Sequence, residues 1–345
     1  MRVESTTNHI SKTVESTFNT GETTGANYEG VPTTQPFFLL PKMEKVNDAN
    51  RVGRNAPTHV CNTYWSPGQI GLADDAETGV PARLLRRALG GSVTDTTVSA
   101  GVYDHTFGIL PPQTGPILPS FSFISVLDAA TFLLHGCMVE SFKLSQKGAE
   151  RAQFEAAIVN SGKFTTPHGV TSLPAQGTPK CLDGWRTVVS YLDSDGTTTV
   201  DLSSLGKVID WMVEHKNNIR TNKRRQGDPT ITVNTGIGAY VRSMPRGKYE
   251  TNAQIIVDFA DLTDWQKSVK NEELSNLKFT CIGPVIASTY RHEFEIIVPR
   301  FVFDSPDTGD DEGDAATPIN IICLEDATTK GTITGRIRNA TATLL

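Results

Sequence analysis

Several common functional signals are missing from this 345-residue chain. The cysteines are few and dispersed, without a C-x-x-C pair, so the ligand spacing of a zinc site is absent. Four of them stand in apolar, strand-like surroundings and are expected to be buried free thiols of a protein folded in a reducing compartment: Cys61, Cys137, Cys281 and Cys323. No apolar run approaches the ~20 residues that span a bilayer, and no signal peptide is predicted.

Recognisable catalytic motifs are also lacking: the sequence has no G-x-S-x-G, P-loop, H-E-x-x-H or Rossmann fingerprint. The histidines are scattered, and only His105 and His292 stand at matching positions of a repeated motif. They could be metal ligands or acid–base groups, but no second histidine and no catalytic motif accompanies either of them, so a structural role is favoured. The net charge of −6 argues against tight, charge-driven binding of nucleic acid over the whole surface.

An internal repetition is the strongest positive signal. Three short patterns occur twice in the same order, with insertions of different length between them. They are Y-x-H-x-F at 103–107 and 290–294, a Pro-x-Phe-x-Phe pattern at 119–123 and 299–303, and Asp-Ala-Ala-Thr with a following cysteine at 128–137 and 314–323. Three matches in one order indicate a duplication, and the insertions are expected in loops.

The polarity pattern predicts many strands and one short helix per copy. In the first copy we expect strands near 37–46, 58–65, 102–109, 120–127, 136–144 and 151–159, with a helix at 81–89 that begins at Pro81 and ends at Gly90. In the second copy we expect strands near 208–215, 249–259, 277–283, 290–303, 318–324 and 332–338, with a helix capped by Thr263. Each copy is expected to close with a terminal hairpin. The fold class is therefore mainly β, as two duplicated sandwich or open-barrel domains.

The domain boundaries follow from composition. We expect a polar N-terminal arm at 1–36, a first repeat at 37–165, a connector at 166–204 and a second repeat at 205–345. The arm is rich in Thr, Ser, Asn and Gly and cannot bury enough surface to fold alone, so a neighbouring subunit is expected to hold it. On this interpretation, deletion of the arm leaves folded subunits and weakens their stacking.

Two charged clusters are candidate binding surfaces. The basic loop consists of Arg220, Lys223, Arg224 and Arg225. It lacks the aromatic residues that stack bases, so pairing with another subunit is favoured over nucleic-acid contact or plain solvation. The acidic stretch consists of Asp304, Asp307, Asp310, Asp311, Glu312 and Asp314. Its spacing matches no EF-hand, and a solvated loop is favoured over a calcium site or an acidic surface facing DNA.

Taken in order, these motifs resemble those of the major tail tube proteins of long-tailed, siphovirus-like bacteriophages, over about residues 37 to 345. The quoted segments are 103–107, 118–123, 136–144, 208–218, 251–259, 293–303 and 339–341. The resemblance implies stacked rings whose sheets join into one continuous inner β-barrel, with loops and the N-terminal arm linking successive rings. It implies no enzymatic activity, no cofactor and no metal.

The same resemblance implies the surroundings of the protein. It places the chain in the virion tail, assembled in the host cytoplasm, with the tape-measure protein and phage DNA passing through the channel. Tail terminator and baseplate or distal tail proteins are the implied partners at the ends, with no membrane contact. If both repeats are tube domains, three chains form a pseudo-sixfold ring, and otherwise six are needed. The alternative is a duplicated β-sandwich that decorates the virion or acts as an adhesin.

Overall fold

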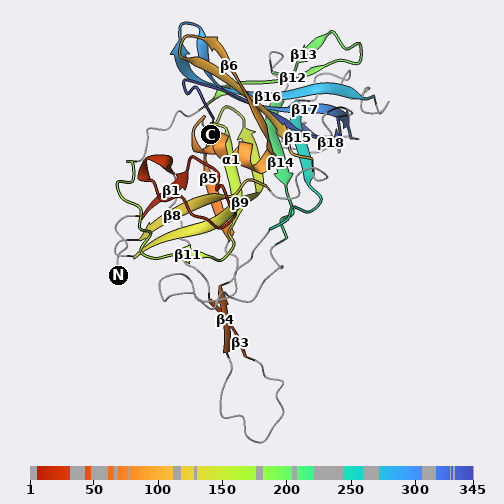
Figure 1. The fold of residues 1–345 in the computed structure, drawn as a ribbon. Coiled ribbons are helices and arrows are strands. Elements are labelled where there is room, and N and C mark those ends of the chain that lie inside the picture. The colour runs from red at the N-terminus through yellow and green to blue at the C-terminus, as the bar shows by residue number, and fades with distance from the viewer. Residues whose placement is uncertain are drawn as a thin grey trace, which may run out of the picture.

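The computed structural model describes residues 6–31, 43–47, 61–65, 69–76, 78–111, 118–127, 130–175, 182–203, 208–220, 244–258, 272–304, 316–326, 328 and 331–344. The described chain is mainly β, as predicted, and its strands pair antiparallel. No described helix has the length and apolarity that a bilayer crossing requires. Figure 1 shows β1, β8 and β11 at one end of the molecule, β12, β13 and β16–β18 at the other, and α1 between them.

The first sheet runs through both sequence repeats and is called the spanning sheet here. Its strands lie in the order β5 (Gln69–Asp75), β10 (Gln153–Val159), the second half of β9 (Ala130–Lys147), β14 (Val208–Lys216), β15 (Glu250–Asp258) and β18 (Ala316–Leu324). One face of this sheet covers the core and the other is open. The two repeats are therefore joined edge to edge, through β9 and β14.

The second sheet packs across the core from the spanning sheet and is called the ladder sheet. It runs in the order β6 (Gly90–Ser99), β7 (Val102–Ile109), β19 (Thr334–Asn339), β17 (Tyr290–Phe303), β16 (Leu274–Ala287), β12 (Asp183–Leu192) and β13 (Thr199–Asp201). The end of β17 also pairs with β18, which connects the ladder sheet to the spanning sheet.

The remaining strands form two smaller units. The N-terminal sheet contains β2 (Tyr28–Gly30), β1 (Thr6–Ser11), β8 (Phe121–Leu127), the first half of β9 and β11 (Phe164–Thr165), with a short 3-10 helix η1 at Gly25–Asn27. A separate hairpin of β3 (Met43–Asn47) and β4 (Cys61–Trp65) extends away from the sheets in Figure 1. Among the described strands, these two pair only with each other.

The helix α1 (Val80–Leu89) confirms the prediction from Pro81 and Gly90. Gly90 ends it in the left-handed conformation, with φ of 74°, and its N–H donates to the carbonyl of Arg86. The leucines of the helix and Ala88 are buried: Leu84, Leu85, Ala88 and Leu89. The helix packs against β9, β19, β6 and β7, so it covers one end of the core.

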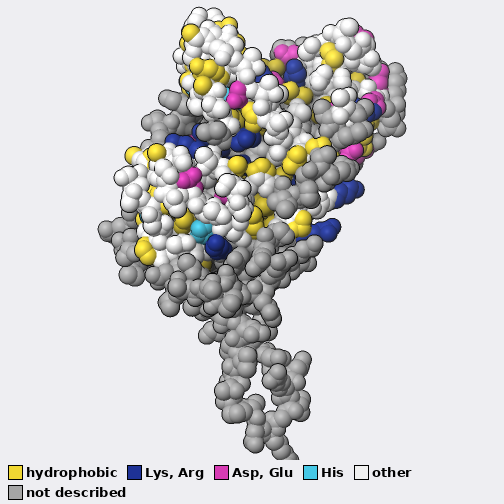
Figure 2. All heavy atoms as spheres, in the orientation of Figure 1, with side chains coloured by type: hydrophobic (Ala, Val, Ile, Leu, Met, Phe, Trp, Pro, Cys, Tyr) yellow, Lys and Arg dark blue, Asp and Glu magenta, His cyan; other side chains and the backbone are white. Residues whose placement is uncertain are grey.

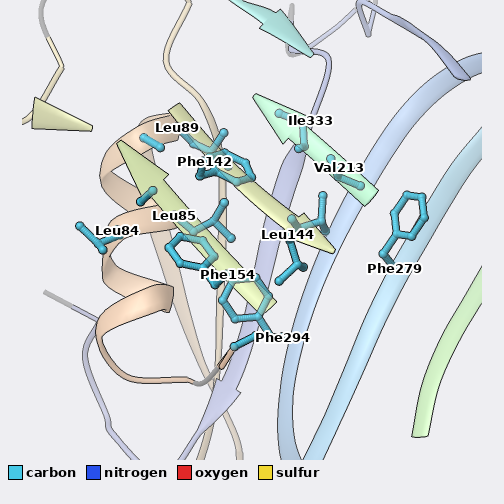
Figure 3. Packing of buried hydrophobic residues seen from close by; sticks show 14 of the residues in the cluster. Leu84, Leu85, Leu89, Phe142, Leu144, Phe154, Val213, Phe279, Phe294 and Ile333 are labelled. Atoms are coloured by element: carbon cyan, nitrogen blue, oxygen red, sulfur yellow. The ribbon is translucent and has the colours of Figure 1, made fainter. Parts of the chain in front are cut away.

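Aromatic side chains fill the core between the two large sheets. Phe142 and Phe154 of the spanning sheet stack with ring centroids 6.2 Å apart, and Phe154 meets Phe294 of the ladder sheet edge-on at 6.2 Å. Trp211 and Phe279 make a second contact across the sheets at 5.0 Å. Leu84, Leu85 and Leu89 of α1 belong to the same cluster, part of which is drawn in Figure 3. One core thus contains residues of both repeats.

The predicted terminal hairpins have different outcomes. The first is confirmed, because β9 and β10 pair antiparallel around a turn at 148–150. The second is wrong: β19 does not pair with β18 but lies between β7 and β17. The physical reason is that this position buries Ile337 against the core and gives Arg336 and Arg338 carboxylate partners on both neighbouring strands.

Residues 6–31 of the predicted N-terminal arm pack on their own chain, where β1 pairs with β8 from Thr6 to Ile10. The contact of the arm with a neighbouring subunit stays a prediction. Ile10, Tyr28 and Val31 are buried. The segment has no regular spacing of apolar residues, and polar side chains fix it in place as well. The most central of these is Glu15, whose carboxylate accepts hydrogen bonds from Gly136, Ser120, Ser122 and Asn19.

One residue pair of the sheet register occurs at matching positions of the two halves. Phe121 of β8 stands directly opposite Cys137 of β9, and Phe301 of β17 stands directly opposite Cys323 of β18. These are the phenylalanines and cysteines that the repeated sequence patterns align. The expected buried thiols are found at Cys137 and Cys281, whereas Cys323 is only partly buried. The expected second helix at Thr263 lies outside the described residues.

Candidate assembly surface

The seam between the two repeats is a regular antiparallel pairing of β9 with β14. Seven residue pairs form it, from Asp210 opposite Lys147 to Lys216 opposite Ser141. Beyond its end, Asn217 is buried, and its side-chain N–H groups donate to the carbonyls of Val139 and Ala88 at 3.1 and 2.9 Å. Since the seam carries both strand pairing and a buried side-chain anchor, the halves are held together as one body.

A buried histidine supports the end of the seam. His215 hydrogen-bonds Thr251 through Nδ1 at 2.9 Å and Asn217 through Nε2 at 3.3 Å. Complete burial lowers the pKa of His215 to about 3, so the imidazole is neutral at physiological pH. Arg246 closes the network by donating to the Asn217 side chain and the carbonyl of Leu110. These contacts position the backbone segments beside the seam.

On the open face of the spanning sheet, positive charge is compensated strand by strand. Its six strands contain three lysines and no arginine in the sequence. Every one of these lysines stands directly opposite a carboxylate on a neighbouring strand: Lys143 opposite Glu155 and Glu214, Lys147 opposite Asp210, and Lys216 opposite Glu250. Lys216 also pairs with Glu214 at 3.0 Å. Cross-strand neighbours of opposite sign attract each other, so this face offers little free positive charge.

The ladder sheet carries a second set of compensated charges on its outer face. Arg338 donates to Asp104 and Glu293 at 2.7 and 2.8 Å, and Arg336 donates to Glu293 and Glu295 at 2.8 and 2.9 Å. Desolvation acts to raise the pKa of Asp104, but hydrogen bonds from the two arginines outweigh it and lower that pKa. Each guanidinium is therefore occupied by partners within the sheet. We call these five side chains the charge ladder.

We expect Arg338→Met to lower the free energy of unfolding by about 1–2 kcal/mol, because two half-buried carboxylates lose their partner. The loss should shrink as pH falls: Asp104 has a lowered pKa, so its stabilisation is present above 3.8 and disappears below it. Urea unfolding at pH 7 and pH 3 measures both effects. The matched control is Arg300→Met, which removes an exposed pair with Glu273 and should cost less. Equal losses in the two variants would show that the half-buried ion pairs of Arg338 stabilise the fold no more than the exposed pair of Arg300 does.

The two open edges of the sheets are long. Among the described strands, β5 pairs only with β10, and β6 pairs only with β7. Residues 94–97 of β6 are exposed and include a single charge, Asp95. Monomeric proteins usually shield such edges with charge, proline or short strands, so these edges are available to another strand.

The histidines at the matched positions have different hydrogen-bond partners, and the structural role favoured from the sequence stays a prediction. His105 is buried between Asp95 at 2.6 Å and Asn339 at 3.0 Å. His292 hydrogen-bonds Thr78 at 2.9 Å. In the described part of the chain, no group of three or more His, Cys, Asp or Glu side chains could hold a metal ion.

The candidate basic loop is only partly within the described residues. Arg220 is exposed, and its backbone N–H donates to the carbonyl of Pro245. Lys223, Arg224 and Arg225 lie outside the described ranges, as does the acidic stretch from 305 to 315.

The pairing of lysines with carboxylates on the spanning sheet was not predicted from the sequence. The only signal in the sequence is the alternation of polar and apolar residues within each single strand. Figure 2 shows small groups of both charge signs scattered over the visible face.

A scan of the sequence against models of known protein families finds no match, and no curated protein matches it either.

Proposed function

We propose that this chain is a structural virion protein that self-assembles into stacked rings and forms a bacteriophage tail tube, the conduit for DNA ejection. The proposal begins from the sequence resemblance and gains support from the sheet architecture. No catalytic step, cofactor or metal belongs to it. The channel would carry the tape-measure protein and then DNA, and terminator and baseplate or distal tail proteins would bind its ends.

The observation that carries the proposal is the β9–β14 seam. It joins the two sequence repeats edge to edge in one antiparallel sheet, the kind of junction that neighbouring domains of a ring need. The sheet ends at β5, whose outer edge has no partner among the described strands. A ring closed from such sheets removes the open edges.

The seam also favours three chains per ring over six. The repeated register, with Phe121 opposite Cys137 and Phe301 opposite Cys323, supports two equivalent tube domains within each chain. If the seam is the intrachain form of a junction that also occurs between chains, three chains supply six domains. The ring is then a trimer with pseudo-sixfold symmetry.

The charge pattern of the spanning sheet suits a channel wall. DNA binds a basic surface because each neutralised phosphate releases counterions, and such binding would hinder its passage. The lysines of the open face stand opposite carboxylates in the register, and the strands of this sheet carry more acidic than basic residues. We therefore assign the open face of the spanning sheet to the lumen. The basic loop at 220–225 remains a proposed contact between subunits, away from the lumen.

Negative-stain microscopy of the purified full chain tests the function directly. Rings or tubes with a central channel are the expected result. Isolated particles of single-chain size at all concentrations and salt conditions would contradict self-assembly and favour the alternative, a decoration protein or adhesin.

Removing the compensating carboxylates should create affinity for DNA. Glu155→Gln with Glu214→Gln frees Lys143 on both sides. We expect binding to double-stranded DNA that weakens steeply between 50 and 200 mM salt, about tenfold or more. The control, Glu150→Gln with Glu272→Gln, raises the net charge by the same two units at exposed or half-buried positions that are not opposite Lys143. Fluorescence anisotropy with labelled DNA distinguishes them, and equal affinity for both variants would overturn the assignment of this face.

A further inference from the structure

Two irregular segments close on each other over the N-terminal sheet. The first is residues 6–31 and the second is residues 160–175, which follows β10. His9 meets Pro174, and Lys163 Nζ donates to the carbonyl of Asn19 at 2.9 Å. Two glycines make the other contacts: a Cβ on Gly21 would overlap the His135 ring, and a Cβ on Gly25 would overlap the carbonyls of 171–172. We call this pair of segments the clasp.

His135 lies at the centre of the clasp. It is on β9, buried, and its Nε2 is 2.8 Å from Thr165 Oγ1. Its backbone carbonyl accepts hydrogen bonds from Ser161, and its N–H donates to Lys163. The other ring nitrogen, Nδ1, faces Gly21 and has no hydrogen-bond partner among the described residues. A proton on both nitrogens would therefore place an uncompensated charge against the backbone of the first segment.

Two further histidines, His9 and His168, make contacts in the clasp through their neutral imidazole rings. His9 on β1 is buried, and its Nε2–H donates to the carbonyl of Pro174 at 3.0 Å. Its Nδ1 is buried without a partner in the described structure, so it has no acceptor for a second proton. His168 uses Nδ1 to accept the backbone N–H of Val170 at 2.9 Å, which requires that nitrogen to be unprotonated.

We propose that this clasp is an acid-sensitive latch: protonation of His9, His135 and His168 opens the contact between the 160–175 segment and the N-terminal segment while the two large sheets stay folded. All three rings act in the neutral form. His9 and His135 contact the 160–175 segment, and His168 shapes that segment from within. Opening would release the N-terminal segment, which carries β1, from its cover.

The charges around the clasp point the same way. Lys163 faces His135, and His168 faces His9, so both neighbours disfavour a further positive charge. The residues opposite His9 on β8 and β2 are Ile124 and Gly30, which carry no charge. Glu15 binds the N–H of Gly136, next to His135, but burial raises the pKa of Glu15, so acid also neutralises this carboxylate.

The direction of the pH effect follows from these shifts. Burial lowers the pKa of His9 and His168, and lowers that of His135 to about 4. The open form has the ordinary pKa near 6.5 and binds more protons, so opening becomes more favourable as pH falls from 6.5 to about 4. From pH 7.5 to 5.0, His135 alone should raise the opening equilibrium about 30-fold.

Hydrogen exchange followed by mass spectrometry on the full chain tests the latch, with rates corrected for intrinsic pH dependence. We expect protection to fall about 30-fold or more in 6–31 and 160–175 between pH 7.5 and 5.0, and to change little in β16 and β17. His9→Gln with His135→Gln keeps an N–H donor at both positions and leaves only His168 of the three rings to titrate, so it should remove most of the acid response. The control, His292→Gln in the ladder sheet, should retain it.

A uniform loss of protection, or the same acid response in the double variant, would overturn the proposal. If the double variant does not fold, NMR titration of the wild-type imidazoles decides. The latch requires His9 and His135 to titrate below their ordinary pKa of 6.5, in step with the loss of protection in 160–175. Titration near 6.5 with the segments still protected would refute it.

Discussion

Deleting residues 1–31 is expected to lower the free energy of unfolding by more than about 5 kcal/mol, or to prevent folding altogether. The deletion removes the buried side chains of Ile10 and Tyr28 and uncovers the edge of β8. It also removes the carbonyls of residues 11–13, to which the fully buried guanidinium of Arg87 donates. A buried cation that loses its acceptors is strongly destabilising.

Chemical denaturation of the full and shortened chains measures this effect. A point variant separates the contribution of Arg87 from that of the other contacts of residues 1–31. Arg87→Met in the full chain should lower the free energy of unfolding by about 2–3 kcal/mol, because three carbonyls lose their donor. The exposed Arg220→Met serves as the matched control and should leave the midpoint unchanged. A shortened chain as stable as the full one would restore the sequence-based expectation of a dispensable arm.

Phe294→Ala should be the most damaging single substitution in the core, with a loss of about 3–5 kcal/mol. Phe294 is fully buried on β17 and meets Phe154 across the two large sheets. Its loss leaves a cavity at the contact that holds the spanning sheet and the ladder sheet together. Since that core is common to both repeats, unfolding should remain a single transition.

Guanidinium unfolding followed by tryptophan fluorescence and by circular dichroism tests the loss and the single transition. The control is Ile322→Ala, an apolar residue that is 48 % exposed on β18, and it should cost less than about 1 kcal/mol. Two separated transitions, or a similar cost for both variants, would show that the sheets do not pack as one core.

Elements with clear alternation or clear end signals were predictable from the sequence. The helix α1 was marked by Pro81 and Gly90, and β14 by its alternating apolar residues. The strands β7 and β17 fall at the predicted residues. In these segments local sequence and burial agree, because one face of each element covers the core.

Elements without an apolar period were missed. β1 and β6 consist largely of Thr, Ser, Asn and Gly, and each lies in its sheet because a neighbouring strand offers backbone partners. The pairing of β19 with β7 joins residues about 230 positions apart, which no local pattern specifies. The same applies to the candidate site: the carboxylates opposite Lys143 come from two different strands, so only the register reveals them.

Native mass spectrometry of rings released from assembled tubes tests the central claim most directly. If each chain contributes two tube domains joined at the β9–β14 seam, the released ring contains three chains of 37.5 kDa. Averaged end-on views by electron microscopy should then show threefold symmetry with six similar lobes. Six chains per ring would contradict the two-domain account, and a monomer as the only species would contradict the tube itself.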